Sequence, residues 1–131
     1  MSLCYGDDFL NKKTIPYTNF NTLFRETNIV SAKDLILPAT TLTDSCYSQM
    51  FYYCAALVDG PSILPATILA EDCYKHMFEH CTSLVNAPKL PATILAEDCY
   101  AGMFDFCKSL VNAPKLPATT LTPGCYYAMF F

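Results

Sequence analysis

The tetrapeptide Leu-Pro-Ala-Thr occurs four times in this chain, beginning at Leu37, Leu64, Leu90 and Leu116. Successive copies are 27, 26 and 26 residues apart, and one extra residue near Ile63 explains the longer step. A chain that repeats a short unit at a fixed period buries the apolar face of each unit against its neighbours. The repeat therefore predicts a stacked solenoid, and its period falls within the range of about 20–29 residues that is typical of leucine-rich repeats.

Other residues recur with the same period. Seven of the eight cysteines belong to the repeat, and each repeat also carries a Met-Phe pair and a Cys-Tyr pair. We divide the chain, as a single domain of residues 1–131, into a degenerate N-terminal part (4–36), three full repeats (37–63, 64–89 and 90–115) and a truncated repeat (116–131). Because the chain starts and stops within repeats, we expect it to be a segment of a longer array.

Each repeat contains a segment whose pattern predicts a short helix. On a helical wheel of about 100° per residue, the apolar residues of segment 71–81 gather on one side and the charged residues on the other. Asp44, Glu71, Glu97 and Pro123 stand at the expected first position, where an acidic residue or proline favours a helix start. A very short strand is expected after each helix, at 56–58, 83–85 and 109–111, where a following proline limits pairing.

Composition excludes several classes of function. The chain has a net charge of −4, and no stripe of Lys or Arg runs along the repeats, so neither nucleic acid nor an anionic membrane surface is expected as a partner. No segment resembles a signal peptide or is long and apolar enough to predict membrane insertion. No phosphate-binding loop or nucleophile triad is present, and no cofactor is expected.

The cysteines could form disulfides, bind a metal or pack as buried thiols. Cys73 and Cys81 would lie about 12 Å apart along a helix, too far for a disulfide between them. A bridge between successive repeats stays open, but buried free thiols explain the regular spacing equally well. No Cys-x-x-Cys spacing occurs, so we expect no zinc site built from these residues.

One motif points to catalysis. Residues 76–80, His-Met-Phe-Glu-His, match the H-x-x-E-H pattern of inverted zinc proteases, in which two histidines on a helix face bind zinc. Alignment of the repeats weakens this interpretation, because the position of His76 is taken by Gln49 and Gly102 in the other repeats. Solvated histidines explain the motif better than a metal site. A zinc-dependent protease through His76, Glu79 and His80 is therefore the least favoured alternative, and we expect no metal and no catalytic residue.

The aromatic residues divide into an inner and an outer set. The columns of Tyr and Met-Phe lie on the apolar side of the expected helix, which favours core packing over a binding role. Binding is assigned to positions that point away from the core. The candidate ligand-binding residues are Tyr53, Asn86, Lys89, Asn112 and Lys115.

The repeat also resembles a known family. Residues 90–114 begin with an apolar-Pro pair, place an aromatic residue before x-x-Cys and close with Ser-Leu, and in this they resemble the repeat of BspA-like bacterial leucine-rich-repeat surface proteins. The match covers residues 37–131 and departs from the usual form by having Met-Phe in place of Ala-Phe. The resemblance implies a right-handed solenoid, a cell-surface or secreted location, and adhesion to or recognition of host or neighbouring proteins.

We therefore predict an α/β, leucine-rich-repeat-like right-handed solenoid with one short helix and one short strand per repeat. Its expected function is that of a non-enzymatic cell-surface module that binds an extracellular or host protein, or a glycan. A passive structural stalk of a larger surface protein is the first alternative. Apolar residues at the end of the chain, Phe130 and Phe131, predict end-to-end self-association.

Overall fold

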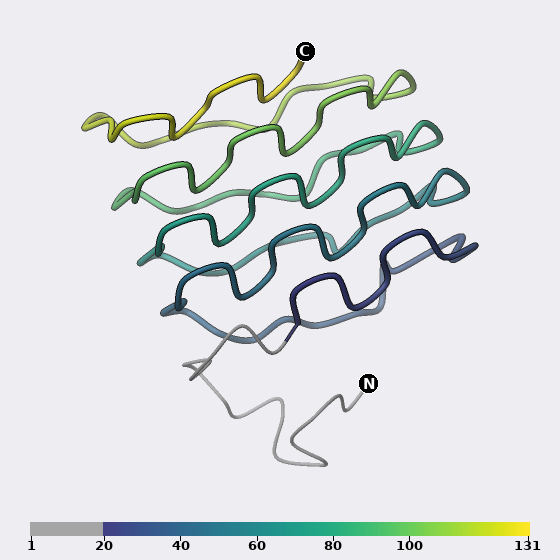
Figure 1. Ribbon diagram of the computed structural model, residues 1–131, viewed down its shortest axis with the longest axis horizontal. Helices are drawn as coiled ribbons and strands as arrows, with labels where there is room; N and C mark the ends of the chain where they lie inside the picture. The colour runs from purple at the N-terminus through teal and green to yellow at the C-terminus, as the bar shows by residue number, and fades with distance from the viewer. Residues whose placement is uncertain (1–19) are drawn as a thin grey trace.

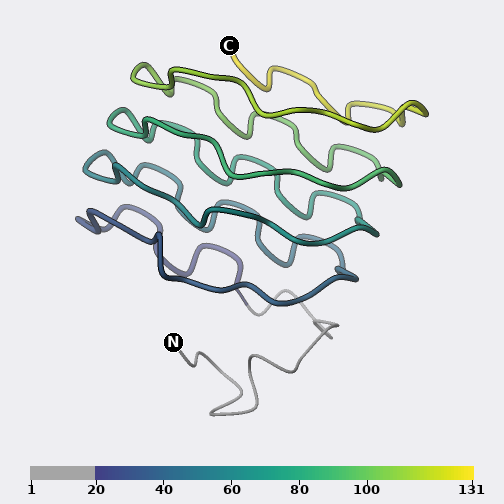
Figure 2. The same ribbon diagram turned by 180° about the vertical axis from the view of Figure 1, so that it is seen from behind.

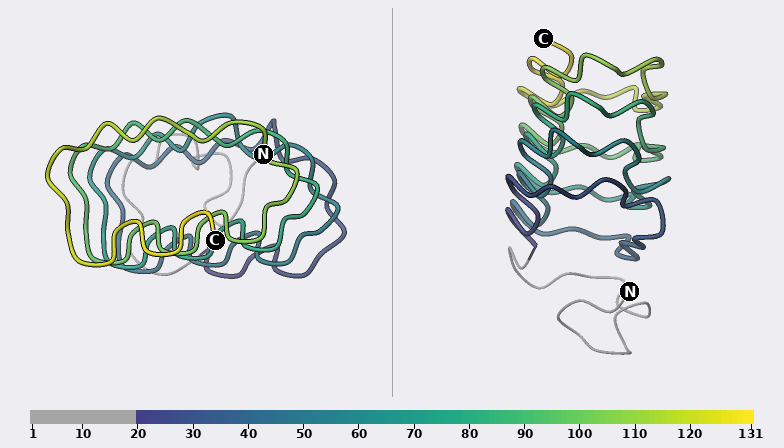
Figure 3. Two further views of the ribbon diagram at one scale, coloured as in Figure 1. Left: turned by 90° about the horizontal axis from the view of Figure 1, so that it is seen from above. Right: turned by 90° about the vertical axis from the view of Figure 1, so that its right-hand side faces the viewer.

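The computed structural model describes residues 20–131, so the earlier part of the degenerate repeat, with Cys4, lies outside the described residues. The chain winds into coils that lie on top of one another (Figure 1). It runs along the near side of Figure 1 from left to right, returns along the far side and rises toward the C-terminus, which makes the coil right-handed. Seen from above, each coil is an elongated ring with two long sides (Figure 3).

The predicted helix and strand of each repeat are wrong. No described residue is in an α-helix, and the only strand-like residues are those of isolated parallel bridges between coils. The segments expected to be helical are instead runs of consecutive turns, and we call them turn segments: residues 20–26, 44–53, 71–80, 97–106 and 123–130. They form one long side of the stack, and the return segments between them form the other, which faces the viewer in Figure 2. In the described residues no helix exists that could cross a lipid bilayer.

Backbone hydrogen bonds explain why turns replace the helix. In segment 71–80 alternate N–H groups donate within the coil, as Met77 does to the Tyr74 carbonyl at 3.1 Å. The residues between them donate to the next coil, as His76 does to the Ala101 carbonyl at 2.8 Å. A helix would satisfy the same groups internally, but a helix of about ten residues is marginally stable on its own. The turns instead link each coil to its neighbour through the backbone.

Every fourth residue of a turn segment has a left-handed backbone. In segment 71–80 these residues are Asp72, His76 and His80, with φ of 55°, 53° and 60°. The equivalent residues of the other segments are Thr22, Glu26, Ser45, Gln49, Tyr53, Asp98, Gly102, Phe106, Gly124 and Ala128. A left-handed conformation costs a non-glycine residue about 1–2 kcal/mol. The hydrogen bonds and ring stacking between coils must offset this cost.

The left-handed backbone of Ala128, which has a φ of 48°, predicts how a substitution there changes stability. Ala128→Gly is expected to raise the free energy of unfolding by up to about 1 kcal/mol, because glycine adopts a left-handed backbone without strain. Ala101 is buried in segment 97–106 and is not among the left-handed residues, so Ala101→Gly should lower stability. Urea unfolding of both variants checks the prediction, and destabilisation by both changes would contradict it.

The return segments are held by sparse pairing. The bridges join Ser31 to Asp59, Thr41 to Ile68, Asp59 to Asn86, Ile63 to Lys89, Ile68 to Ile94 and Asn86 to Asn112. None lies within the strands expected at 56–58, 83–85 and 109–111. Prolines recur among the return segments and cannot donate to a ladder, which explains why pairing stays isolated. The register changes by one residue between the Asp59 and Ile63 bridges, which places the extra residue at 60–62, close to its expected position.

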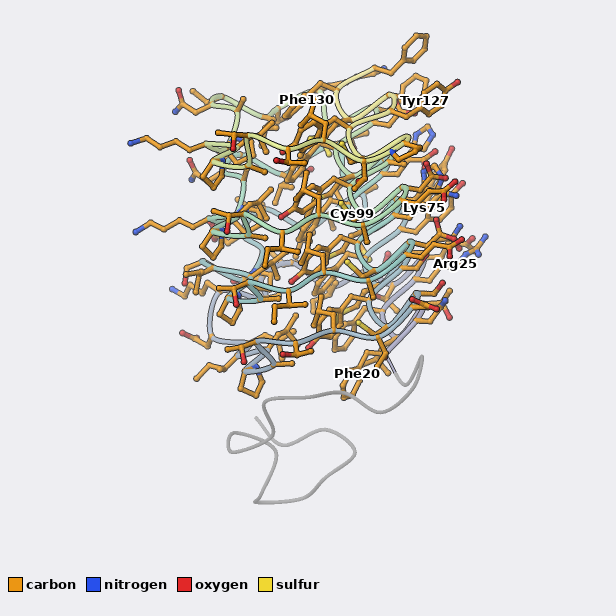
Figure 4. All side chains as sticks on the ribbon, turned by 90° about the vertical axis from the view of Figure 1, so that its left-hand side faces the viewer. Phe20, Arg25, Lys75, Cys99, Tyr127 and Phe130 are labelled. Carbon is orange, nitrogen blue, oxygen red and sulfur yellow. The ribbon has the colours of Figure 1, made fainter. Side chains whose placement is uncertain are left out.

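The interior confirms the predicted columns. Tyr47, Tyr74, Tyr100 and Tyr126 stack with ring centroids 5.7–5.8 Å apart, and Phe20 continues this column. A second column runs through Phe24, Phe51, Phe78, Phe104 and Phe130 at 5.3–5.6 Å. In Figure 4, Phe20, Cys99 and Phe130 lie between the two long sides, whereas Arg25, Lys75 and Tyr127 lie along the outer edge of the turn side. The stack is therefore a continuous core whose layers are copies of one another.

Candidate functional site: a proline groove on the return side

An open groove of about 500 Å³ runs across the return side of adjacent coils. Two copies of the string Ala-Pro-Lys-Leu-Pro, at 87–91 and 113–117, supply most of its wall. The residues that line it are Ile63, Ala87, Pro88, Lys89, Leu90, Pro91, Pro114, Lys115 and Pro117. Aliphatic side chains and proline rings dominate this surface, with one lysine from each string.

Local backbone structure explains how the lysines come to face outward. Leu90 is 4% exposed and anchors its string in the core, whereas the preceding residue, Lys89, is exposed. Successive side chains of an extended segment point to opposite sides, so burial of Leu90 turns Lys89 toward solvent. The backbone of Lys89 is held between the N–H of Leu64 and the carbonyl of Ser62, both at 3.0 Å.

The two lysines form a local concentration of positive charge. Lys89 and Lys115 occupy equivalent positions in successive coils, and both line the groove. Neither lysine forms an ion pair with any described residue, and no acidic side chain lines the groove. The positive pair therefore stands out on a chain whose net charge is −4.

Two asparagines lie beside the groove. Asn86 and Asn112 are exposed and are joined by a parallel bridge, and each directly precedes an alanine, Ala87 or Ala113, in the repeated string. Their amides can donate and accept hydrogen bonds at the groove's margin. The structure thus brings together four of the five residues predicted to bind a ligand, as two adjacent columns.

Tyr53, the fifth predicted residue, lies apart from the groove on the turn side. Its ring stacks on His80 at 4.2 Å, and His80 stacks in turn on Phe106 at 4.4 Å. Tyr52 packs beside Tyr53, and the Arg25 guanidinium lies 4.7 Å from the centre of the Tyr52 ring. The faces of the stacked rings are covered by one another, so this cluster mainly exposes ring edges.

The histidines of the H-x-x-E-H motif lie on this turn side, not on a helix. The Glu79 carboxylate contacts Nδ1 of His76 and lies 3.7 Å from Nε2 of His80. Within residues 20–131 no group of three or more His, Cys, Asp or Glu side chains is placed to hold a metal ion. The zinc-protease alternative depends on two histidines that lie one turn apart on a helix. In the structure both histidines instead occupy left-handed positions of a turn segment.

The seven described cysteines are free thiols, and only Cys107 is partly exposed. Cys54, Cys81 and Cys107 each donate a hydrogen bond to a carbonyl of the preceding coil, at 2.9, 3.1 and 3.0 Å. Burial is the main cause that raises the pKa of Cys107 to about 12 and of Cys46 to about 12. Because the thiolate is the reactive form, the raised pKa makes Cys46 and Cys107 poorly reactive.

Sequence reasoning missed the apolar part of the groove. From the sequence the prolines are expected only to end strands, yet in the structure their rings form the wall of the groove. A signal was present: the string Ala-Pro-Lys-Leu-Pro at 87–91 and 113–117 lies within a longer run that is identical in the two repeats, at 83–93 and 109–119. An unchanged outward string indicates a surface built from both copies.

Comparison with known proteins does not assign this chain to a family. No family model, curated protein or solved structure matches the chain. The resemblance to BspA-like surface proteins and the location that it implies are therefore part of the proposal below.

Proposed function

We propose that this chain is a non-enzymatic module that binds a protein partner through the proline groove. The observation that supports this function is the groove itself, an apolar surface built from an identical string in two coils, whose lysines pair with no acidic side chain in the described part of the chain. Apolar concave surfaces with a few polar groups are typical of binding sites. The core columns and inter-coil hydrogen bonds give the groove a rigid support, which lowers the entropy lost on binding.

We propose that the protein is located at the cell surface or is secreted, as the resemblance to BspA-like proteins implies. The free thiols are compatible with such an oxidising environment, because burial limits the access of oxidants to them. End-to-end self-association also stays a prediction.

Two matched isoleucines test whether the groove is the binding surface. Ile63 lines the groove and is 42% exposed, and Ile68 lies on the same return segment, outside the groove, and is 45% exposed. Ile63→Asn is expected to weaken partner binding about tenfold, because it removes apolar contact at the wall. Ile68→Asn should leave binding unchanged.

The measurement is a screen by biolayer interferometry for extracellular-matrix proteins and peptides that bind the chain. Each partner found is then tested for binding to both isoleucine variants and to the double variant Lys89→Glu/Lys115→Glu. Circular dichroism shows whether each variant keeps the wild-type structure. A partner whose binding is equally sensitive to Ile63→Asn and Ile68→Asn would not be using the groove. Absence of any groove-dependent partner would favour a passive stalk.

A further inference from the structure

The wall of the proline groove cannot bind a ligand in the way that a sheet edge does. Pro88, Pro91, Pro114 and Pro117 have no backbone N–H group. The N–H of Lys89 is already donated to the Ser62 carbonyl at 3.0 Å. A peptide that added itself as a further strand would find few backbone donors here, so recognition must depend on side chains.

The side chains of the groove offer one kind of polar group, the lysine ammonium. Lys89 and Lys115 project from equivalent positions of adjacent coils and have no acidic partner among the described residues. Two like charges held on neighbouring coils repel each other, and a ligand that carries negative charge removes this repulsion. The remaining surface consists of proline, alanine, leucine and isoleucine side chains, which favour an apolar group.

We infer that the groove binds an acidic peptide segment of a partner protein, in which carboxylates pair with Lys89 and Lys115 and an apolar side chain packs against the prolines. This inference depends on the proposed function, because it names the ligand of the same site. An anionic glycan would satisfy the lysines, but its hydroxyl-covered surface would leave the apolar wall unmatched. The combination of charge and apolar surface therefore favours a peptide.

The side-chain amides of Asn86 and Asn112 can bind the backbone of the proposed peptide. They lie at the margin of the groove, next to Ala87 and Ala113, and are exposed. Each amide offers both a donor and an acceptor to the backbone of an extended peptide. They supply the backbone recognition that the prolines cannot.

The experiment uses the full chain and short peptides that contain Leu or Phe flanked by glutamates, with matched peptides in which every Glu is Gln. Isothermal titration should show that the acidic peptides bind at least about tenfold more tightly than their amide counterparts, a difference of about 1.4 kcal/mol. Binding should weaken as salt is added, because exposed charge pairs are screened. Lys89→Gln and Lys115→Gln should each remove most of this preference, and Lys→Arg at the same positions should keep it.

Lys108→Gln serves as the control, because Lys108 is exposed and lies outside the groove. Equal binding of acidic and amide peptides, still sensitive to Ile63→Asn, would overturn the acidic ligand while leaving the proposed binding function intact. Tighter binding of a sulfated oligosaccharide than of any acidic peptide, through the same lysines, would overturn the peptide assignment. Failure of every probe to bind in a manner dependent on Ile63 would remove both the inference and the proposed function.

Discussion

Replacing Phe78 with alanine is expected to lower the free energy of unfolding by about 3–5 kcal/mol. Phe78 is fully buried, and its ring stacks between Phe51 at 5.3 Å and Phe104 at 5.6 Å. The ring also lies against Gly60, in the return segment of the coil below. Removal of the ring leaves a cavity that interrupts a column running through every coil, and neighbouring coils cannot close it without losing their own hydrogen bonds.

Urea unfolding followed by circular dichroism measures this loss. Phe106→Ala is the matched control, because Phe106 is also an aromatic residue of a turn segment but is 39% exposed. It should lower stability by about 1 kcal/mol or less. Equal losses in the two variants would show that the inner column does not carry the stability that we assign to it.

Replacing Gly102 with valine is expected to lower the free energy of unfolding by about 3 kcal/mol. Gly102 has a φ of 59°, a conformation that is strained for a β-branched residue. A Cβ at this position would also collide with the imidazole of His76 in the adjacent coil. Backbone strain and steric overlap thus act together at one residue.

The smaller change Gly102→Ala distinguishes the observed fold from the helix that the sequence predicts. Inside a helix, Gly102→Ala would raise stability by about 1 kcal/mol, because alanine is the better helix former. In the observed turn segment it should lower stability. A second variant, His76→Ala, removes the ring that the new methyl group would meet, so the loss caused by Gly102→Ala should shrink by about 1 kcal/mol in that background. A stabilising Gly102→Ala, or a double-mutant cycle without coupling, would contradict the structure.

The charged residues of the turn side reinforce the contact between coils. The Lys75 ammonium lies 3.0 Å from a carboxylate oxygen of Asp72 in its own coil and 3.0 Å from one of Asp98 in the next. Hydrogen bonds to Asp98 and then Asp72 raise the pKa of Lys75. These side chains are about one-third exposed, so the pairs add little stability individually. They differ from Lys89 and Lys115, which have no such partners among residues 20–131.

Several features of the fold could be predicted because they depend on the repeat alone. The stacking of coils follows from identical units that cannot bury their apolar face singly, and Tyr74, Met77 and Phe78 were correctly placed inside. The predicted helix failed for a specific reason. Cys73, Met77 and Cys81 recur every four residues, and over so short a segment a period of 4 differs from the helical 3.6 by only about 40° per step.

The candidate site was predicted in part for a related reason. Lys89 and Lys115, and likewise Asn86 and Asn112, recur at the repeat period, so stacking alone brings each pair together. The separation of Tyr53 from them also agrees with the sequence, because Tyr53 lies in a segment predicted to be helical and the other four residues lie in the segments that follow. The proline wall was missed because a proline's effect on strand pairing is evident from sequence, whereas the surface that its ring forms depends on the coil beside it.

The sequence by itself determined that this protein is a stack of similar coils with cysteine, methionine, tyrosine and phenylalanine inside, because a periodic apolar pattern can be buried only against its own copies. Only the tertiary structure decided the backbone of each coil. In a turn segment, half of the N–H groups donate to the following coil, so the left-handed residues and the absence of a helix depend on a neighbour about 26 residues away in the chain. The groove, made by two coils together, depends on the same neighbour.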